Sequence, residues 1–366
     1  MEIVPLYVFK PVGNWTLSEP VRAMGDIFTR FPEEFLKRGF KIVYDDDPNK
    51  NLESLKEYLG EMESPEALLN RDKQVIVWSH EAYFCGPLRT LKKKYPNRLK
   101  IVVWYDDLHS ADIGWKQLLQ EIDRLVCPYN IRYMKGCKYQ QIKDTIITPH
   151  SNKVVCIPYF VYSHRIKPQQ SQEEWTKRFS AKVTLAGYTH EAIYPVRNEW
   201  SKKEYLVKVL KFPGYYEKHK SVETNDRFYE FLSKHAYGIS TSDAYGFYFL
   251  AKYLELPAMQ LVMFAQHHPQ LKDCGFVENV HYKPLDENTI NNALEIERNT
   301  HAKYHTLAKF GKISPERLKA ISQRDSNRRK QELYEISVNA RKLIVEKHTE
   351  VARFDQLCDL FKTLSF

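Results

Sequence analysis

The sequence lacks any run of about 18 consecutive apolar residues, which is the length that a helix needs to cross a membrane. Its first residues, MEIVPLYVFK, also lack the basic region followed by a long apolar core that marks a secretory signal peptide. Both absences argue against a membrane protein and against secretion. We therefore expect a soluble protein of the cytoplasm.

Cysteine is scarce, and its spacing follows no pattern of known chemistry. No two cysteines form a Cys-x-x-Cys pair, and none stands at metal-ligand spacing from a histidine. We expect reduced, mostly buried thiols and predict no metal centre. The six cysteines are Cys85, Cys127, Cys137, Cys156, Cys274 and Cys358.

The formal net charge of +9 has no nucleic-acid-binding signature to accompany it. A basic protein can attract nucleic acid, an anionic membrane or an anionic small molecule. No RNP, zinc-finger or helix-turn-helix pattern occurs, and the lysines and arginines are interspersed with acids rather than gathered in one stripe. Nucleic-acid binding is therefore the less favoured hypothesis, because an anionic small-molecule ligand would account for the same excess.

What the chain does contain is an alternation of short apolar runs and helix-like segments. With 366 residues it exceeds the size of about 250–300 residues at which a single core stops growing, so we expect two domains. The alternation predicts parallel sheets whose strands are buried on both faces and whose ligands collect at the carboxyl ends of the strands. The first-half runs with strand character are 3–10, 40–47, 74–81, 99–107 and 124–129.

The second half repeats this pattern after a polar stretch at 161–182 that contains Pro168. Such a change of composition predicts a linker. Within the second half, the segment 236–286 reads as strand, tight turn, helix, strand, a loop rich in His and Pro, and another strand. The predicted divisions are an N-terminal Rossmann-like domain (1–165), a linker (166–181), a C-terminal Rossmann-like domain (182–347) and a terminal helix (348–366).

Polar side chains follow several predicted strands of the first half. They form three clusters, namely Asp45-Asp46-Asp47, His80-Glu81, and Asp106-Asp107 with His109. Carboxylates and imidazoles at strand ends are candidates for acid–base catalysis. Asp106 and Asp107 have two other interpretations: they could cap the following helix, or they could hold a divalent ion.

Four stretches, spread over most of the chain, carry a resemblance to a known family. They are VVWYDD (102–107), VVCIPYFVYSHR (154–165), VTLAGYTHEAIYPVRNEW (183–200), and the last stretch, which runs from YGFYFLAKYLELPAMQLVMF (245–264) through GFVENVHYKPLDENT (275–289) to RKLIVEKHTEVARFDQL (341–357). In their shared order these stretches resemble the GT-B glycosyltransferases, in the group-1-like branch that includes the CgeB-type proteins.

The resemblance implies two Rossmann-like domains facing across a cleft, with the last helix crossing back to the N-terminal domain. It also implies transfer of a hexosyl or pentosyl group from a nucleotide-sugar donor, UDP- or GDP-linked, to a hydroxyl of a glycan or glycoconjugate. No cofactor or metal is expected. The alternative is a non-catalytic glycan- or nucleotide-binding protein with a degenerate GT-B fold.

For the donor, the resemblance implies a site in the second domain. Glu255 matches the acid that accepts hydrogen bonds from the ribose hydroxyls, and an exposed helix glutamate is the alternative interpretation. The turn at 242–246 could offer helix amides to the diphosphate, and Lys252 or Arg197 could neutralise it, although Arg197 could equally be a surface cation. The predicted donor-binding residues are Gly187, Tyr188, Arg197, Pro213, Asp243, Tyr245, Gly246, Lys252 and Glu255.

The first domain is expected to supply catalysis and the acceptor site. Asp106 is the first candidate for the catalytic base, with His109 and His80 as further catalytic candidates. The predicted acceptor-binding residues are Gly13, Asn14, Glu81 and Asp107. The basic segment 300–330 is interpreted as a solvated helical excursion, with contact to an acceptor or a membrane surface as the alternative.

The sequence departs from the family's pattern at two places. Retaining members commonly carry two glutamates eight positions apart, but Phe247 stands eight positions before Glu255. Ala258 and Met259 replace the small Gly-containing pair that often follows. The stereochemical outcome of the reaction is therefore left open.

Overall fold

The chain forms two compact units, called unit 1 and unit 2 below. Unit 1 consists of Met1–Pro158 and Val351–Phe366, and unit 2 of Tyr159–Glu350. The computed structural model describes residues 3–9, 41–44, 69, 73–80, 87–105, 119–134, 140, 143–210, 228–244, 246–298 and 314–364.

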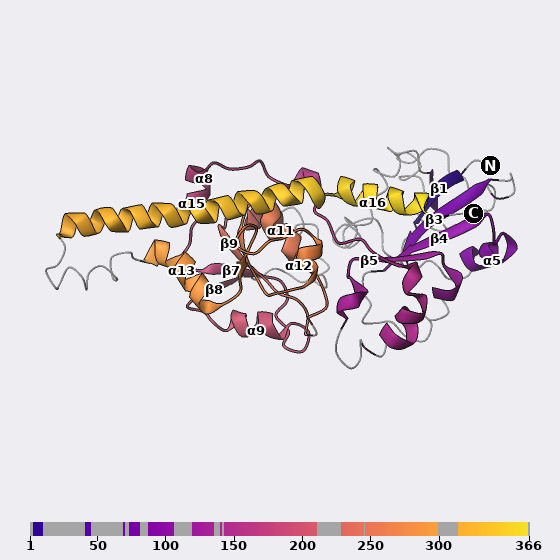
Figure 1. Ribbon diagram of the computed structural model, residues 1–366, viewed down its shortest axis with the longest axis horizontal. Helices are drawn as coiled ribbons and strands as arrows, with labels where there is room; N and C mark the ends of the chain where they lie inside the picture. The colour runs from indigo at the N-terminus through magenta and orange to yellow at the C-terminus, as the bar shows by residue number, and fades with distance from the viewer. Residues whose placement is uncertain are drawn as a thin grey trace. The chain divides into compact units, whose positions relative to one another are not determined.

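The sheet of unit 1 has six parallel strands in the order β2-β1-β3-β4-β5-β6. Figure 1 labels β1, β3, β4 and β5 of this sheet. The apolar runs of β4 and β5 are almost entirely buried, as expected of strands that are covered on both faces. The strands are β1 (Ile3–Phe9), β2 (Lys41–Tyr44), β3 (Gln74–His80), β4 (Leu99–Trp104), β5 (Arg124–Cys127) and β6 (Val154–Cys156).

Helices and helical turns connect these strands. They include α5 (Pro87–Lys94), η3 (Ile131–Tyr133), η4 (Lys143–Ile147) and η5 (Thr148–Lys153). The last helix, α16 (Glu350–Lys362), packs in unit 1 from Val351 onward, where the ring of Phe361 lies 6.4 Å from that of Trp78. The predicted return of the terminal helix to the N-terminal domain is confirmed.

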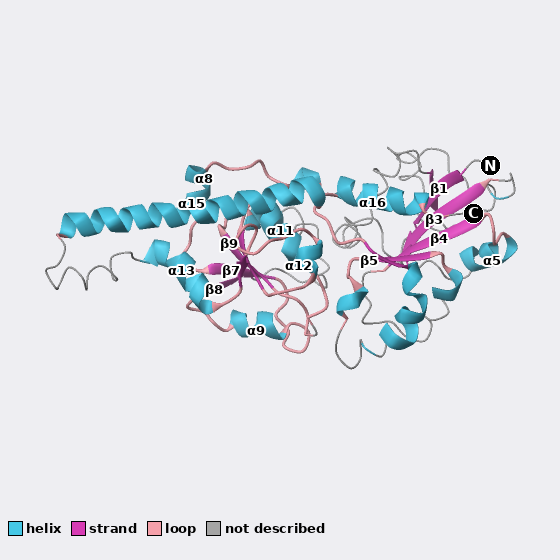
Figure 2. Ribbon diagram, in the orientation of Figure 1, coloured by secondary structure: helices cyan, strands magenta, loops and turns pink. Residues whose placement is uncertain are grey.

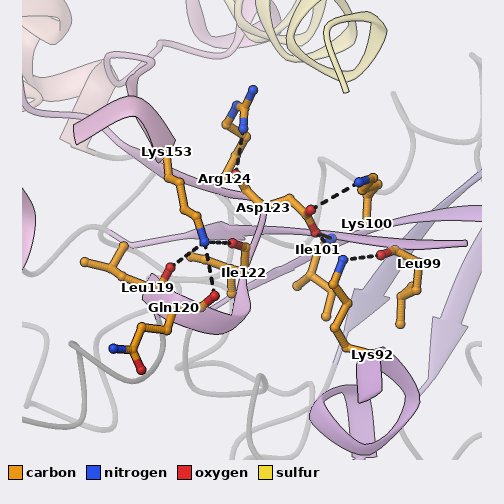
Figure 3. A network of polar contacts seen from close by, with 10 residues as sticks. All are labelled: Lys92, Leu99, Lys100, Ile101, Leu119, Gln120, Ile122, Asp123, Arg124 and Lys153. Carbon is orange, nitrogen blue, oxygen red and sulfur yellow. Dashed lines mark hydrogen bonds and ion pairs between the residues drawn. The ribbon is translucent and has the colours of Figure 1, made fainter. Parts of the chain in front are cut away.

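A network of hydrogen bonds and ion pairs lies at the amino ends of β4, β5 and β6 (Figure 3). The Lys153 ammonium donates to three backbone carbonyls at 2.8, 3.1 and 2.8 Å, at and just beyond the end of the helical segment 119–121. Those carbonyls belong to Leu119, Gln120 and Ile122. The Asp123 carboxylate accepts from the Ile101 amide and from Lys92, at 2.8 Å each. This network lies at the strand ends opposite those that bind ligands in such sheets, so it serves stability.

The sheet of unit 2 has five parallel strands in the order β11-β10-β9-β7-β8. In the view of Figure 2, α11 and α15 lie above these strands and α9 lies below them. Both units are therefore parallel α/β sheets with helices, which confirms the predicted fold class. The strands are β7 (Val183–Ala186), β8 (Val207–Leu210), β9 (Tyr237–Ser240), β10 (Val262–Ala265) and β11 (Lys283–Pro284).

The two longer helices described in unit 2 are α13 (Glu287–Arg298) and α15 (Pro315–Lys347). The long α15 begins at Ser314, whose side chain accepts a hydrogen bond from the Arg317 amide. Further helical elements include η6 (Ser163–Arg165), α8 (Gln172–Thr176), α9 (Pro195–Ser201), the segment 228–232, α11 (Lys252–Ala258) and α12 (Gln270–Asp273).

The segment predicted as a linker, 166–181, lies within unit 2 and contains α8. A capping box between Ser171 and Glu174 starts this helix. Trp175 is fully buried in the core, where its indole N–H donates to the Gln260 carbonyl at 2.8 Å. One apolar side chain among polar neighbours therefore anchors a segment whose composition is that of a linker.

Candidate functional site

The carboxyl ends of β7, β9 and β10 meet at one edge of the unit 2 sheet, because these strands are parallel neighbours. Gly187 follows β7, Thr241 follows β9 and Gln266 follows β10. The predicted donor residues that the structure describes lie at or near this edge. They are Gly187, Tyr188, Arg197, Asp243, Gly246, Lys252 and Glu255.

Two basic side chains lie close to the position that a Cβ of residue 187 would occupy. The φ of Gly187, +108°, is one that residues with a side chain rarely adopt. A Cβ at this position would lie 2.8 Å from Arg197 Nη1 and 4.0 Å from Lys252 Cε. A glycine here therefore lets the backbone approach both basic side chains.

Arg197 is a buried cation and not a surface one, because only 4% of it is exposed. Its Nε donates to Thr241 Oγ1 at 3.2 Å and its Nη1 to the Tyr188 carbonyl at 3.1 Å, and neither acceptor neutralises the charge. The guanidinium also lies 4.3 Å from the centroid of the Tyr194 ring. Burial lowers the pKa of Arg197, although the pKa of an arginine leaves it charged at neutral pH. A buried cation with such partners is suited to an anionic ligand.

Lys252 and Glu255 form an ion pair on the first turn of α11. The side chains are 18% and 13% exposed, so the interpretation of Glu255 as a freely exposed helix residue does not fit. Lys252 Nζ bonds Glu255 Oε2 and lies 4.2 Å from the centroid of the Phe228 ring. The Tyr229 hydroxyl donates to Glu255 Oε1 at 3.2 Å.

The turn after β9 differs from the predicted strand-to-helix connection. Residues 247–250 are not helical, and α11 begins only at Lys252. The buried Asp243 carboxylate instead accepts from the backbone amides of Phe247 and Tyr248, at 2.8 and 2.9 Å. Asp243 therefore shapes this loop, and Gly246, with φ of +64°, turns it.

His268 was not among the sequence-based candidates, although the loop rich in His and Pro contains it. Its Nδ1 accepts from the Gln270 amide at 3.1 Å, so Nε2 carries the proton and donates to the Phe247 carbonyl at 3.0 Å. Only 1% of the residue is exposed, and burial lowers its pKa to about 4. His268 thus fixes the loop at 247–250 to the turn after β10.

The remaining site predictions fall largely outside the described residues. His80 ends β3, and the structure describes its backbone alone. The predicted residues outside the described ranges are Gly13, Asn14, Glu81, Asp106, Asp107, His109, Pro213 and Tyr245.

Two features are absent from the described part of the chain. No group of three or more His, Cys, Asp or Glu residues is arranged there to hold a metal ion. None of the helices described has the length and apolar character needed to span a membrane.

Comparison with known proteins gives matches in structure alone. No protein-family model and no curated protein sequence matches the chain. The crystal structure of a glycosyltransferase from Rickettsia africae covers 99% of this chain and 98% of its own, at 13% identity and a TM-score of 0.51. Sucrose-phosphate synthase from Thermosynechococcus elongatus covers 99% and 98%, at 11% identity and 0.48. HepE from Anabaena, in complex with UDP-glucose, covers 98% and 99%, at 10% identity and 0.47.

At these identities the likeness is one of fold. The chain has the fold of the GT-B glycosyltransferases, with one parallel α/β sheet in each unit. Membership of the CgeB-type branch stays a prediction.

Proposed function

We propose that this protein is a glycosyltransferase that moves a sugar from a nucleotide-sugar donor to a hydroxyl of a glycan or glycoconjugate. The observation that carries the proposal is that the side chains of Arg197 and Lys252 both lie close to Gly187. Two cations beside the backbone at Gly187 suit a diphosphate, and Glu255, paired with Lys252, suits the ribose hydroxyls.

The two cations would act on the leaving group. Negative charge builds up on the nucleoside diphosphate as the glycosidic bond breaks, and fixed positive charges stabilise it most where water is excluded. Arg197 meets that condition because it is buried and held by Thr241 and the Tyr188 carbonyl. We therefore also propose that the reaction needs neither a divalent ion nor another cofactor, with UDP or GDP as the carrier.

Unit 1 would supply the acceptor site and the catalytic base. Asp106 remains our first candidate for the base, and His109 and His80 remain further catalytic candidates, since these residues follow or end predicted strands of the first half. Gly13, Asn14, Glu81 and Asp107 remain candidates for acceptor binding. We propose a hexosyl or pentosyl group as the cargo and the cytoplasm as the compartment.

We further propose that the basic segment 300–330 makes peripheral contact with an anionic membrane. The described part of this segment supports the idea, because Arg317, Arg324 and Arg328 are all exposed on α15. Their spacing of seven and four residues puts them on one face of the helix.

Release of nucleotide from a panel of UDP- and GDP-sugars tests the proposed function. We expect release that increases with a glycan acceptor, and at least a tenfold loss of affinity for the matching nucleoside diphosphate in Arg197→Met, since a hydrogen bond to a charged group contributes about 1.5–3 kcal/mol. Arg341→Met is the matched control, because Arg341 also donates to a backbone carbonyl, that of Lys167, at 2.7 Å.

Two outcomes would count against the proposal. Tight glycan binding without release from any donor would instead support the non-catalytic alternative. Equal affinity of the Arg197→Met and Arg341→Met variants for the nucleoside diphosphate would remove Arg197 from the site.

A further inference from the structure

Two adjacent aromatic residues, Phe228 and Tyr229, contact opposite members of the Lys252–Glu255 ion pair. The Phe228 ring lies 4.2 Å from the Lys252 ammonium, and the Tyr229 hydroxyl donates to Glu255 at 3.2 Å. Both aromatic residues belong to the helical segment 228–232. Neither was a sequence-based candidate for the site.

Tyr229 is itself held in place by a buried cation. Arg165 lies 5.2 Å from the centroid of the Tyr229 ring and 5.4 Å from that of Tyr162. Both Arg165 and Tyr229 are buried. The packing of Arg165 therefore fixes the position of the Tyr229 ring, and with it the hydroxyl that donates to Glu255. A residue that orients a binding group must itself be held in this way.

The hydrogen bonds that the described residues make to Glu255 leave part of its carboxylate available. A carboxylate offers about four acceptor positions on its two oxygens. Within the described part of the chain, Tyr229 takes a position on Oε1 and Lys252 a position on Oε2, so each oxygen keeps one further position for a ligand hydroxyl. Two such positions, one on each oxygen, match two neighbouring hydroxyls of a sugar ring.

We propose that Tyr229 is a positioning residue for donor binding, which holds the Glu255 carboxylate in the orientation that accepts both ribose hydroxyls. This inference rests on the proposed function and adds to it a residue that sets selectivity for ribose. A glutamate side chain has three rotatable bonds, so an unheld carboxylate would lose entropy on binding. The Tyr229 hydroxyl removes part of that cost before the ligand arrives.

Calorimetry on the full chain tests the proposal with UDP, GDP and the 2′,3′-dideoxy form of each. Tyr229→Phe removes only the hydroxyl and keeps the ring against Arg165. We expect about tenfold weaker binding of the ribose nucleotide, as for the loss of one hydrogen bond to a charged group, and unchanged binding of the dideoxy nucleotide. The preference for ribose therefore falls about tenfold.

Tyr205→Phe is the matched control. The Tyr205 hydroxyl also donates to a glutamate, Glu287 Oε1, at 3.1 Å, but on an exposed surface. Its loss should leave both affinities unchanged. Glu255→Gln provides a second test. It should reduce the preference for ribose by itself, and adding Tyr229→Phe to it should then change that preference no further.

The outcomes separate this proposal from the proposed function. A wild-type protein that prefers the ribose nucleotide, with an equal preference in Tyr229→Phe, overturns the role of Tyr229 alone. Equal weakening of ribose and dideoxy nucleotides would show a structural role and overturn it as well. A wild-type protein that binds neither UDP nor GDP would overturn the proposed function, and this inference with it.

Discussion

Replacing Gly187 by alanine should destabilise unit 2 and weaken its binding of a nucleoside diphosphate. The φ of +108° at Gly187 costs a residue with a side chain about 2 kcal/mol. The new Cβ would lie 2.8 Å from Arg197 Nη1, so the guanidinium must move and lose its bond to the Tyr188 carbonyl, at about 2 kcal/mol for a hydrogen bond to a charged group. Together these terms lower the free energy of unfolding of unit 2 by about 4 kcal/mol.

Urea denaturation followed by circular dichroism measures the first effect, and calorimetry with UDP and GDP measures the second. Affinity should fall about tenfold, because the displaced Arg197 no longer reaches the diphosphate. Gly275→Ala is the control, since φ there is +81° and a Cβ would come no closer than 3.4 Å to Leu343 Cδ1. Its expected cost is about 1 kcal/mol, with no change in affinity. Equal losses of stability in the two variants, or unchanged affinity in Gly187→Ala, would refute the proposed geometry.

Two further predictions concern stability. Lys153→Met should lower the free energy of unfolding of unit 1, measured in urea, by about 2 kcal/mol, because three backbone carbonyls lose their hydrogen-bond donor. Lys93→Met is the control: Lys93 is exposed, so this change should leave the free energy of unfolding unchanged. Acid should destabilise unit 2 through His268, whose pKa of about 4 lies below the unfolded value of about 6.5. The unfolded state then binds more protons between these values, so stability falls from pH 6.5 towards pH 4 by up to about 3 kcal/mol. The urea midpoint of His268→Gln should therefore depend less steeply on pH than that of the wild type, and parallel slopes would contradict the assignment.

Most of the strands could be predicted from sequence because they are short apolar runs, but their ends could not. The sequence predicts one strand over 99–107, whereas β4 ends at Trp104, and β9 at the start of the segment 236–286 ends at Ser240. Tyr105 and Thr241, just beyond these ends, are still buried. Buried positions just beyond a strand carry residue types that are typical of strands, so the sequence extends the strand past the last hydrogen bond of the sheet.

The site shows the same division between local and tertiary information. Gly187 could be named from sequence because it follows a predicted strand, and Lys252 because it is a cation in the segment that the resemblance assigns to the donor. The Phe228–Tyr229 pair could not, since it reads as part of an ordinary amphipathic helix and meets Glu255 only through folding. Trp175 was placed in a linker for a related reason, because a single apolar residue among polar ones has no periodicity to detect.

The missing second glutamate at position 247 has a structural reason. Phe247 is fully buried, with its ring 5.1 Å from that of Tyr248, its amide bonded to Asp243 and its carbonyl to His268. A glutamate there would place an unpaired charge in the core, at a cost of several kcal/mol. The carboxylate that this loop does contain, Asp243, is used to hold the backbone. If the chain transfers a sugar, the group that contacts that sugar must therefore come from a position other than 247.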